Sequence, residues 1–181
     1  PNTIAVKVVN AGENSRWYSG SGIYRHVWLI KTDKTYLDEW DTFINASELK
    51  GKDANIKLST IIHNKTGEEK NCRVDIKILS PAGKQVYTES QSCKISEETP
   101  IRTSFVLQKA ELWASNSPVL YSAEISVYLE EKVCDKLMIP FGVRTLAVSA
   151  EKGFQLNGQT IKLKGGCIHH DNGLLGAVAI D

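Results

Sequence analysis

Apolar and polar residues alternate along several stretches of the chain, and this alternation predicts β-strands. In the stretch 55–64, the apolar residues Ile56, Leu58 and Ile62 all occupy even-numbered positions. The stretches 72–79 and 120–129 show the same spacing. Successive side chains of a strand point to opposite faces, so a period of two places one row in a core and the other in solvent. The pattern therefore indicates antiparallel sheets that are buried on one face.

The region 36–150 is expected to contain seven such strands, separated by turn-rich loops and without an amphipathic helix. They are expected at 39–45, 55–64, 72–79, 85–92, 101–107, 120–129 and 137–149. Many short strands in about 110 residues are typical of an immunoglobulin-like sandwich. The Cys-Trp-Cys spacing of antibody domains is absent. The expected fold class is therefore all-β, with an immunoglobulin-like antiparallel β-sandwich that lacks the antibody signature.

Shorter β patterns flank this region. The stretches 3–9 and 23–30 are predicted to be strands joined by a loop around Trp17. Two strands cannot bury a core alone, so they are interpreted as the closing pair of a larger β-domain. Further along, Asn157-Gly158 predicts a type I′ hairpin, because this dipeptide suits the two positive φ values of that turn. The short link before it predicts that the hairpin is held against the sandwich.

Composition and charge exclude several classes of function. Hydrophobic residues make up 41% and charged residues 24%, which is enough apolar material for a packed core. The 22 basic and 21 acidic residues give a net charge of +1, so neither nucleic acid nor an anionic membrane is the expected partner. No apolar run approaches the roughly 18 residues of a membrane span. No phosphate-binding loop is found, and no cofactor is expected.

The cysteines allow two interpretations. The four of them form no CxxC pair and have no histidine at zinc spacing, so a metal site is not expected from them. If 81–84 is a four-residue hairpin loop, the register places Cys72 opposite Cys93, where a cross-strand disulfide is conceivable. A register slip or a bulge would separate the two residues and leave independent reduced thiols.

The polar triplet His169, His170 and Asp171 is the sharpest chemical signal, because it follows a predicted strand and precedes a turn. Such groups can hydrogen-bond sugar hydroxyls or bind a metal, and they can also be strand-end residues with no task. Adjacent histidines on a strand point to opposite faces, so only one can face a given pocket. Trp17 could stack on a sugar ring or pack in the interface between two domains.

The chain shows no complete catalytic constellation. It has no Gly-x-Ser-x-Gly elbow followed by a helix, no Asn-Glu dipeptide, and no pair of strand-end carboxylates of the kind a retaining glycosidase needs. His26 and His63 lie within alternating strands, which favours satisfied packing or surface positions. Trp40 and Trp113 are interpreted as packing residues at strand ends.

Four motifs occur in the order and spacing of glycoside hydrolase family 2, which the chain resembles over about 150 residues. They are the run 16–29, Leu112-Trp with the later Pro118 and Tyr121, Phe141-Gly-Val-Arg144, and Phe154-x-Leu-Asn-Gly-x-x-Ile-x-Leu-Lys-Gly165.

The resemblance implies a domain layout and an activity. Residues 1–35 would be the last strands of a sugar-binding jelly roll, 36–150 the immunoglobulin-like sandwich, and 151–181 the start of a catalytic (β/α)₈ barrel. The parent protein would be a bacterial, β-galactosidase-like retaining exo-glycosidase that hydrolyses terminal β-galactosides. Both catalytic glutamates of the family would lie beyond Asp181, so this chain would contain no catalytic residue and would be inactive.

The resemblance also implies which residues touch the carbohydrate substrate. His170 falls on the family's histidine that contacts the sugar in the −1 subsite, and Asp171 falls on its acidic neighbour. His169 and Ile168 replace an arginine and an asparagine, which leaves the sugar specificity open among galactoside, glucuronide and mannoside. The loop that contains Trp17 falls where the family's jelly roll approaches the barrel mouth.

Two other functions stay open on the sequence. The chain could be a stand-alone immunoglobulin-like carbohydrate-binding or adhesion module, or the histidine triplet could be a zinc site. The apolar stretch 174–180 would lack its barrel partners, so we expect it to favour self-association into homo-oligomers.

Overall fold

The structure, a computed structural model, describes residues 3–9, 11, 22–23 and 26–167. The chain divides into two compact units, which are described separately: Pro1–Ile30 with Lys164–Asp181, and Lys31–Leu163. All helices and strands of the described residues belong to the second unit.

The second unit contains eleven antiparallel strands and one short 3-10 helix, η1 (Glu39–Asp41). The last strand in the chain is β11 (Gln159–Thr160). The others are β1 (Thr35–Leu37), β2 (Phe43–Lys50), β3 (Asp53–Asn64), β4 (Lys70–Leu79), β5 (Gln85–Ile95), β6 (Glu98–Leu107), β7 (Tyr121–Leu129), β8 (Lys132–Phe141), β9 (Leu146–Ser149) and β10 (Gly153–Leu156).

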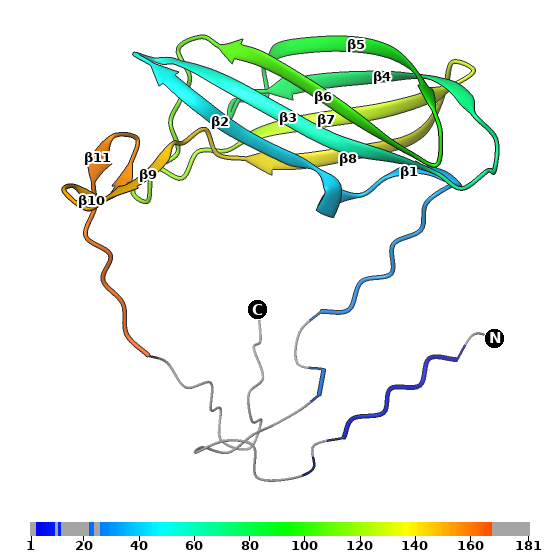
Figure 1. Ribbon diagram of the computed structural model, residues 1–181, viewed down its shortest axis with the longest axis horizontal. Coiled ribbons are helices and arrows are strands. Elements are labelled where there is room, and N and C mark those ends of the chain that lie inside the picture. Colours follow the sequence, from blue (N-terminus) through cyan, green and yellow to red (C-terminus); the bar gives the residue numbers. More distant parts are fainter. Residues whose placement is uncertain (1–2, 10, 12–21, 24–25, 168–181) are drawn as a thin grey trace. The chain divides into compact units, whose positions relative to one another are not determined.

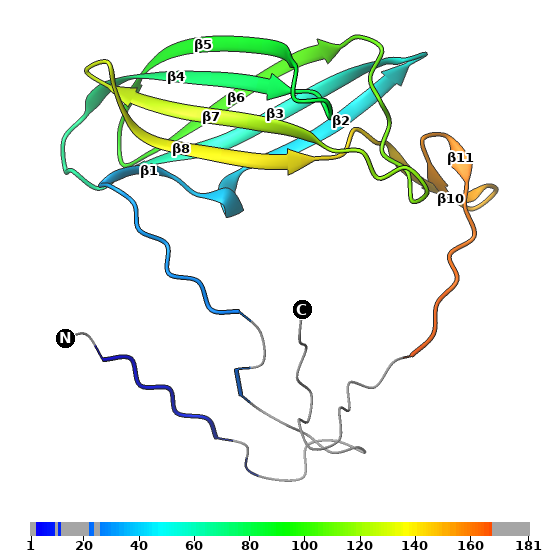
Figure 2. The same ribbon diagram turned by 180° about the vertical axis from the view of Figure 1, so that it is seen from behind.

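Two four-stranded sheets form the sandwich (Figures 1 and 2). In the first, β3 is central, with β1 and β2 along one edge and β6 along the other. The second has the order β5-β4-β7-β8. The expected antiparallel β-sandwich is thereby confirmed, and no α-helix interrupts it anywhere in the described part of the chain.

The core lies between the sheets and consists of the residues that alternation assigned to it. Each of the central strands contributes side chains that are at most 1% exposed: Ile56, Leu58 and Ile62 from β3, Val74, Ile76 and Ile78 from β4, and Ala123, Ile125 and Val127 from β7. Full burial of a valine, leucine or isoleucine side chain contributes about 1.5–3 kcal/mol. The period-two interpretation is therefore confirmed for the three strands in which it was clearest.

The two long edges of the sandwich are closed by specific contacts. At one edge the Leu37 backbone N–H donates to Asp135 Oδ2 on β8 at 2.7 Å. At the other, the rings of Tyr87 on β5 and Phe105 on β6 stack with their centroids 4.0 Å apart. Next to that stack, the Thr103 hydroxyl donates to the Glu89 carboxylate. These contacts join the edge strands of opposite sheets, which share no backbone ladder.

Several expected boundaries are wrong. The strand expected at 39–45 begins only at Phe43, because Asp38 Oδ1 accepts from the Trp40 N–H at 2.9 Å and caps the turn η1. Trp40 is consequently 84% exposed, so its predicted packing role is wrong. The strand expected at 137–149 divides into β8 and β9.

The strands expected at 3–9 and 23–30 are also not formed in the described residues there. A strand needs a hydrogen-bonded neighbour, and no described residue of these stretches pairs with another strand. Ile4, Val6 and Leu29 are correspondingly exposed. The assignment of residues 1–35 to a jelly roll and of 151–181 to a barrel stays a prediction.

Candidate functional site at the sandwich–hairpin junction

The predicted hairpin at Asn157-Gly158 is confirmed. Strands β10 and β11 pair across it, and φ is +52° at Asn157 and +78° at Gly158, as a type I′ turn requires. Asparagine is among the few non-glycine residues that adopt a positive φ readily. Strand β9 pairs with the other edge of β10, so the hairpin becomes a three-stranded sheet of order β11-β10-β9.

Asn157 also bonds to two segments that connect strands, Thr145 between β8 and β9 and Trp113 between β6 and β7. Its backbone N–H donates to the Thr145 carbonyl at 2.9 Å, and its Oδ1 accepts from the Thr145 N–H at 3.0 Å. Its Nδ2 donates to the Trp113 carbonyl, also at 3.0 Å. The side-chain amide therefore uses both its donor and its acceptor on segments that are distant in the sequence.

Trp113 is the centre of this junction. Its backbone N–H donates to the Val143 carbonyl at 2.9 Å. The guanidinium of Arg144 lies 4.5 Å from the centre of the Trp113 ring. A Cβ added at Gly142 would lie 2.8 Å from Trp113 Cβ and Cγ, so only glycine leaves room for the tryptophan. The packing role expected for Trp113 at a strand end is consistent with these contacts.

The junction is suited to holding a hairpin in place and contains no reactive group. Trp113, Gly142, Val143, Arg144 and Asn157 supply amides, an aromatic face and a guanidinium, but no nucleophile and no carboxylate for acid–base chemistry. Three of the four motifs found in the sequence meet here. We therefore define the site by these five residues, the "junction", and regard its task as positioning.

The four residues predicted to touch carbohydrate lie outside the described residues. They are Trp17, His169, His170 and Asp171. Their predicted roles stay predictions.

His63 is a satisfied, partly buried histidine, as expected. Its Nε2 is 2.6 Å from Asp41 Oδ2, its Nδ1 is 3.6 Å from Glu98 Oε1, and its ring stacks on Tyr36 at 5.0 Å. The His26 ring lies near the Trp28 ring, with their centroids 5.6 Å apart.

Across 3–9, 11, 22–23 and 26–167, no three His, Cys, Asp or Glu side chains are grouped as a metal site. No helix in that same part of the chain is long and apolar enough to cross a membrane.

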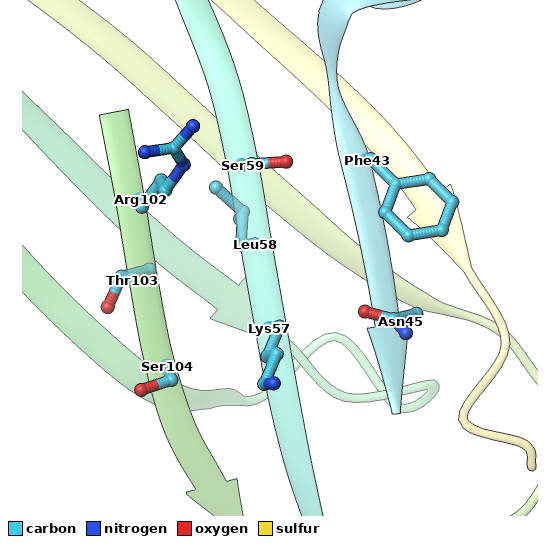
Figure 3. Close-up of a pocket in the computed structure, with 8 residues that line it drawn as sticks. All are labelled: Phe43, Asn45, Lys57, Leu58, Ser59, Arg102, Thr103 and Ser104. Carbon is cyan, nitrogen blue, oxygen red and sulfur yellow. The ribbon is translucent and has the colours of Figure 1, made fainter. Parts of the chain in front are cut away.

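A depression on the outer face of the β2-β3-β6 sheet was not anticipated from the sequence. Two cross-strand rows form its floor: Phe43, Ser59 and Arg102 in one, and Asn45, Lys57 and Ser104 in the other (Figure 3). The cavity has a volume of about 670 Å³. Alternation in the stretch 55–64 predicted that Lys57 and Ser59 face away from the core, but the position of the small Ser59 between two large neighbours becomes visible only once the register is known.

The fold and the junction define a β-sandwich module with a carboxyl-terminal hairpin bonded to it. A family model described as glycosyl hydrolases family 2 matches residues 35–144, which run from the start of β1 to the end of the Phe141-Gly-Val-Arg144 motif. The chain belongs to glycosyl hydrolases family 2.

Individual relatives match nearly the whole chain. The β-galactosidase BoGH2A of Bacteroides ovatus is 37% identical over 180 residues, which are 98% of this chain and 21% of that protein. A putative β-glucuronidase of Formosa agariphila is 34% identical over 97% of this chain and 16% of its own length. A crystal structure of a family 2 member from Bacteroides cellulosilyticus matches with a TM-score of 0.85 and 36% identity, covering 93% of this chain and 22% of that one. The chain thus spans about a fifth of the length of these relatives.

Proposed function

We propose that the chain is a non-catalytic part of a retaining exo-glycosidase that hydrolyses terminal β-galactosides. The observation that carries the proposal is that the similarity to BoGH2A extends over 98% of the chain and therefore includes both flanks of the sandwich. In this proposal 36–150 is the immunoglobulin-like domain, 1–35 ends a jelly roll, and 151–181 opens the barrel. The strand order β5-β4-β7-β8 opposite β2-β3-β6 supports the immunoglobulin-like assignment.

The junction would serve this enzyme by setting the direction in which the chain leaves the sandwich. Asn157 ties the hairpin to Trp113 and Thr145, and the predicted sugar-contacting residues follow in the sequence. Binding groups must be held to a fraction of an ångström in a glycosidase, so a rigid support before them has a function of its own.

Hydrolysis assays test the activity with nitrophenyl β-galactoside and β-glucuronide as substrates. The 181-residue chain should release no nitrophenol from either, because it contains no Asn-Glu dipeptide and the two catalytic glutamates that retention needs are predicted to lie beyond Asp181. The polypeptide extended through its complete reading frame should cleave the galactoside faster than the glucuronide. Turnover by the 181-residue chain would refute the non-catalytic assignment, and a preference for the glucuronide would refute the substrate.

The sugar-contact proposal concerns His170 and Asp171, with His169 and Trp17 beside them. In the extended enzyme, His170→Ala should lower kcat/KM at least tenfold if the imidazole binds the sugar in the −1 subsite. Gln159→Ala, at an exposed position on the outer strand of the hairpin, is the control and should leave kcat/KM unchanged. Equal kinetics for both variants would contradict the assignment of His170.

The alternative function is a carbohydrate-binding module, and the depression beside Phe43 favours it. Phe43 is 64% exposed and shares a row with Ser59 and Arg102, a combination of aromatic face and hydrogen-bonding groups that suits a sugar ring. Calorimetric titration of the 181-residue chain with galactose oligosaccharides tests it. Saturable binding that Phe43→Ala abolishes would support the module, and absence of heat at millimolar sugar would exclude it for these ligands.

A further inference from the structure

Two cysteines face each other across the β4–β5 ladder. Cys72 and Cys93 are directly paired residues, and their Sγ atoms are 3.0 Å apart as free thiols. Directly opposite residues of an antiparallel pair have Cα atoms about 4.5 or 5.5 Å apart. Both distances lie within the range of about 4.4–6.8 Å found for disulfides. The backbone therefore already has the geometry that a cross-strand disulfide needs.

The register that brings these sulfurs together is fixed by other parts of the two strands. The loop is Pro81-Ala-Gly83, one residue shorter than expected, and Val86 is an extra residue that restores the pairing of Ile78 with Tyr87. Val74 and Ile76 are fully buried on the same strand as Cys72. A slip by one residue would turn both toward solvent, so the Cys72–Cys93 pairing is strongly specified.

The pair is also reachable from outside. Cys72 is only 6% exposed, but Cys93 is half-buried, and both line a surface cavity of about 550 Å³. Side chains of both charges, Arg73 and Lys94 with Glu130 and Glu131, line the same cavity. Burial, and then the hydrogen bond with Cys93, raise the pKa of Cys72 to about 12, so Cys72 is a neutral thiol at pH 7.

We propose that Cys72 and Cys93 are a redox-active pair that is oxidised to a cross-strand disulfide by exchange with a disulfide-bonded thiol compound or protein. The Cys93 thiolate attacks one sulfur of the oxidant, whose S–S bond breaks and releases one thiolate. Cys72 then loses its proton and attacks Cys93 Sγ, which releases the second thiolate. The two cysteine thiols thus lose two electrons in total. The oxidant gains these electrons and becomes two thiols, which take up the two protons.

Oxidation would link the edge strand β5 covalently to β4. β5 pairs with β4 on one side only, and on its other side it meets β6 through the contacts of Tyr87 and Glu89. A covalent bond between β4 and β5 closes the intervening hairpin and reduces the freedom of the unfolded chain. The oxidised protein should accordingly unfold at a higher urea concentration than the reduced protein.

Incubation of the full chain with oxidised glutathione, in a Cys167→Ser background that prevents intermolecular bridging through that exposed thiol, tests the proposal. We expect two of the three remaining thiols to disappear, with a mass loss of two hydrogens. Trypsin should then release peptide 71–73 joined to peptide 85–94, and the urea midpoint should rise. Persistence of all three thiols, or a stable glutathione adduct on Cys93 without closure, would overturn the proposal.

Substitutions separate this pair from the other thiols. Cys93→Ser, at a half-buried position, should abolish the thiol loss and the linked peptides. Cys134→Ser is the matched control, because Cys134 is also half-buried but donates to the Val127 carbonyl at 3.3 Å, whereas the sulfur in contact with Cys72 is that of Cys93. It should leave the closure unchanged. Closure that survives Cys93→Ser, or that Cys134→Ser abolishes, would show that a different pair reacts.

Discussion

Asn157 shows how a single residue can satisfy a local and a distant requirement together. Its positive φ serves the turn, and its amide serves Thr145 and Trp113, which lie 12 and 44 positions away. The Asn-Gly dipeptide was sufficient to predict the turn. The amide contacts could not be predicted, because the sequence pattern contains no information about which distant carbonyl lies within hydrogen-bonding distance of the Asn157 side chain.

Substitutions of Asn157 separate these two roles. Asn157→Gly keeps the favourable φ and removes both side-chain bonds, so we expect a loss of about 1–3 kcal/mol in the free energy of unfolding in urea. Asn157→Asp should be less stable still at pH 7, because a carboxylate oxygen would face the Trp113 carbonyl. Part of that extra loss should be recovered as the pH is lowered toward about 4, because the carboxyl group can donate once it is protonated. Wild-type stability of Asn157→Gly would show that the amide contributes nothing.

Gly142 is the second residue on which the junction depends. Gly142→Ala places a methyl group 2.8 Å from Trp113 Cβ and Cγ, and we expect a destabilisation of about 1–3 kcal/mol from overpacking. Gly165→Ala is the matched control, because nothing lies within 4 Å of its added Cβ. Thermal unfolding of both variants measures the difference. The steric argument fails if the two melt at the same temperature.

At the scale of elements, prediction succeeded where one strand face is wholly apolar. β3, β4 and β7 bury the residues that alternation assigned to the core. The predicted pairing of Cys72 with Cys93 across β4 and β5 is also confirmed. Prediction failed where a local side-chain contact or a distant partner decides the backbone. Asp38 turns the chain at η1, and the segment after Phe141 leaves the sheet to pack on Trp113. Alternation alone carries no signal for either event.

The depression and the junction illustrate the same limit for sites. Each combines residues from strands or loops that are far apart in the sequence, so the sequence pattern could place single members, such as Ser59 and Asn157, but could not bring them together.

The shortened loop at Pro81-Ala-Gly83 and the extra Val86 compensate each other. The Cys72–Cys93 register was therefore correct although the loop assumed in deriving it was one residue too long.

A polar ladder across β4, β7 and β8 predicts a dependence of stability on pH. Glu124 lies between Lys136, at 2.8 Å, and Lys77, at 3.3 Å, and its side chain is 16% exposed. The hydrogen bond from Lys136, assisted by Lys77, lowers the pKa of Glu124 although burial acts against it. The ionised carboxylate is thus favoured in the folded protein. Its contribution is complete above the unfolded pKa of roughly 4.3 and is lost as pH falls through the lower folded pKa.

Glu124→Gln should therefore lower the free energy of unfolding at pH 7 by about 1 kcal/mol, since the lysines are themselves half exposed. The difference from wild type should shrink as the pH is lowered below about 4. Glu97→Gln is the control, because Glu97 is 83% exposed and only 3.6 Å from Lys65. Urea unfolding at several pH values measures both. A difference for Glu124→Gln that stays constant with pH would contradict the electrostatic origin.

At the scale of the whole molecule, the described contacts concentrate in one unit. The segment Lys31–Leu163 contains all core residues of the described part of the chain, both sheets of the sandwich, the junction and the hairpin. The described residues of the other unit include Ile4, Val6 and Leu29, all exposed. Hydrophobic burial is the main favourable term in folding, so stability should reside almost entirely in the Lys31–Leu163 unit.

A polypeptide limited to residues 31–163 tests this distribution. It retains every strand of the described residues and the Asn157 contacts, so it should unfold cooperatively and within about 3 °C of the 181-residue chain, roughly the shift that 1 kcal/mol produces in a protein of this size. Ending the chain at residue 150 instead removes β10, β11 and Asn157, which leaves the Trp113 carbonyl without its donor. That shorter form should melt several degrees lower. Equal melting of all three polypeptides would mean that the hairpin is attached to the sandwich without stabilising it, and the positioning role of the junction would then lose its energetic basis.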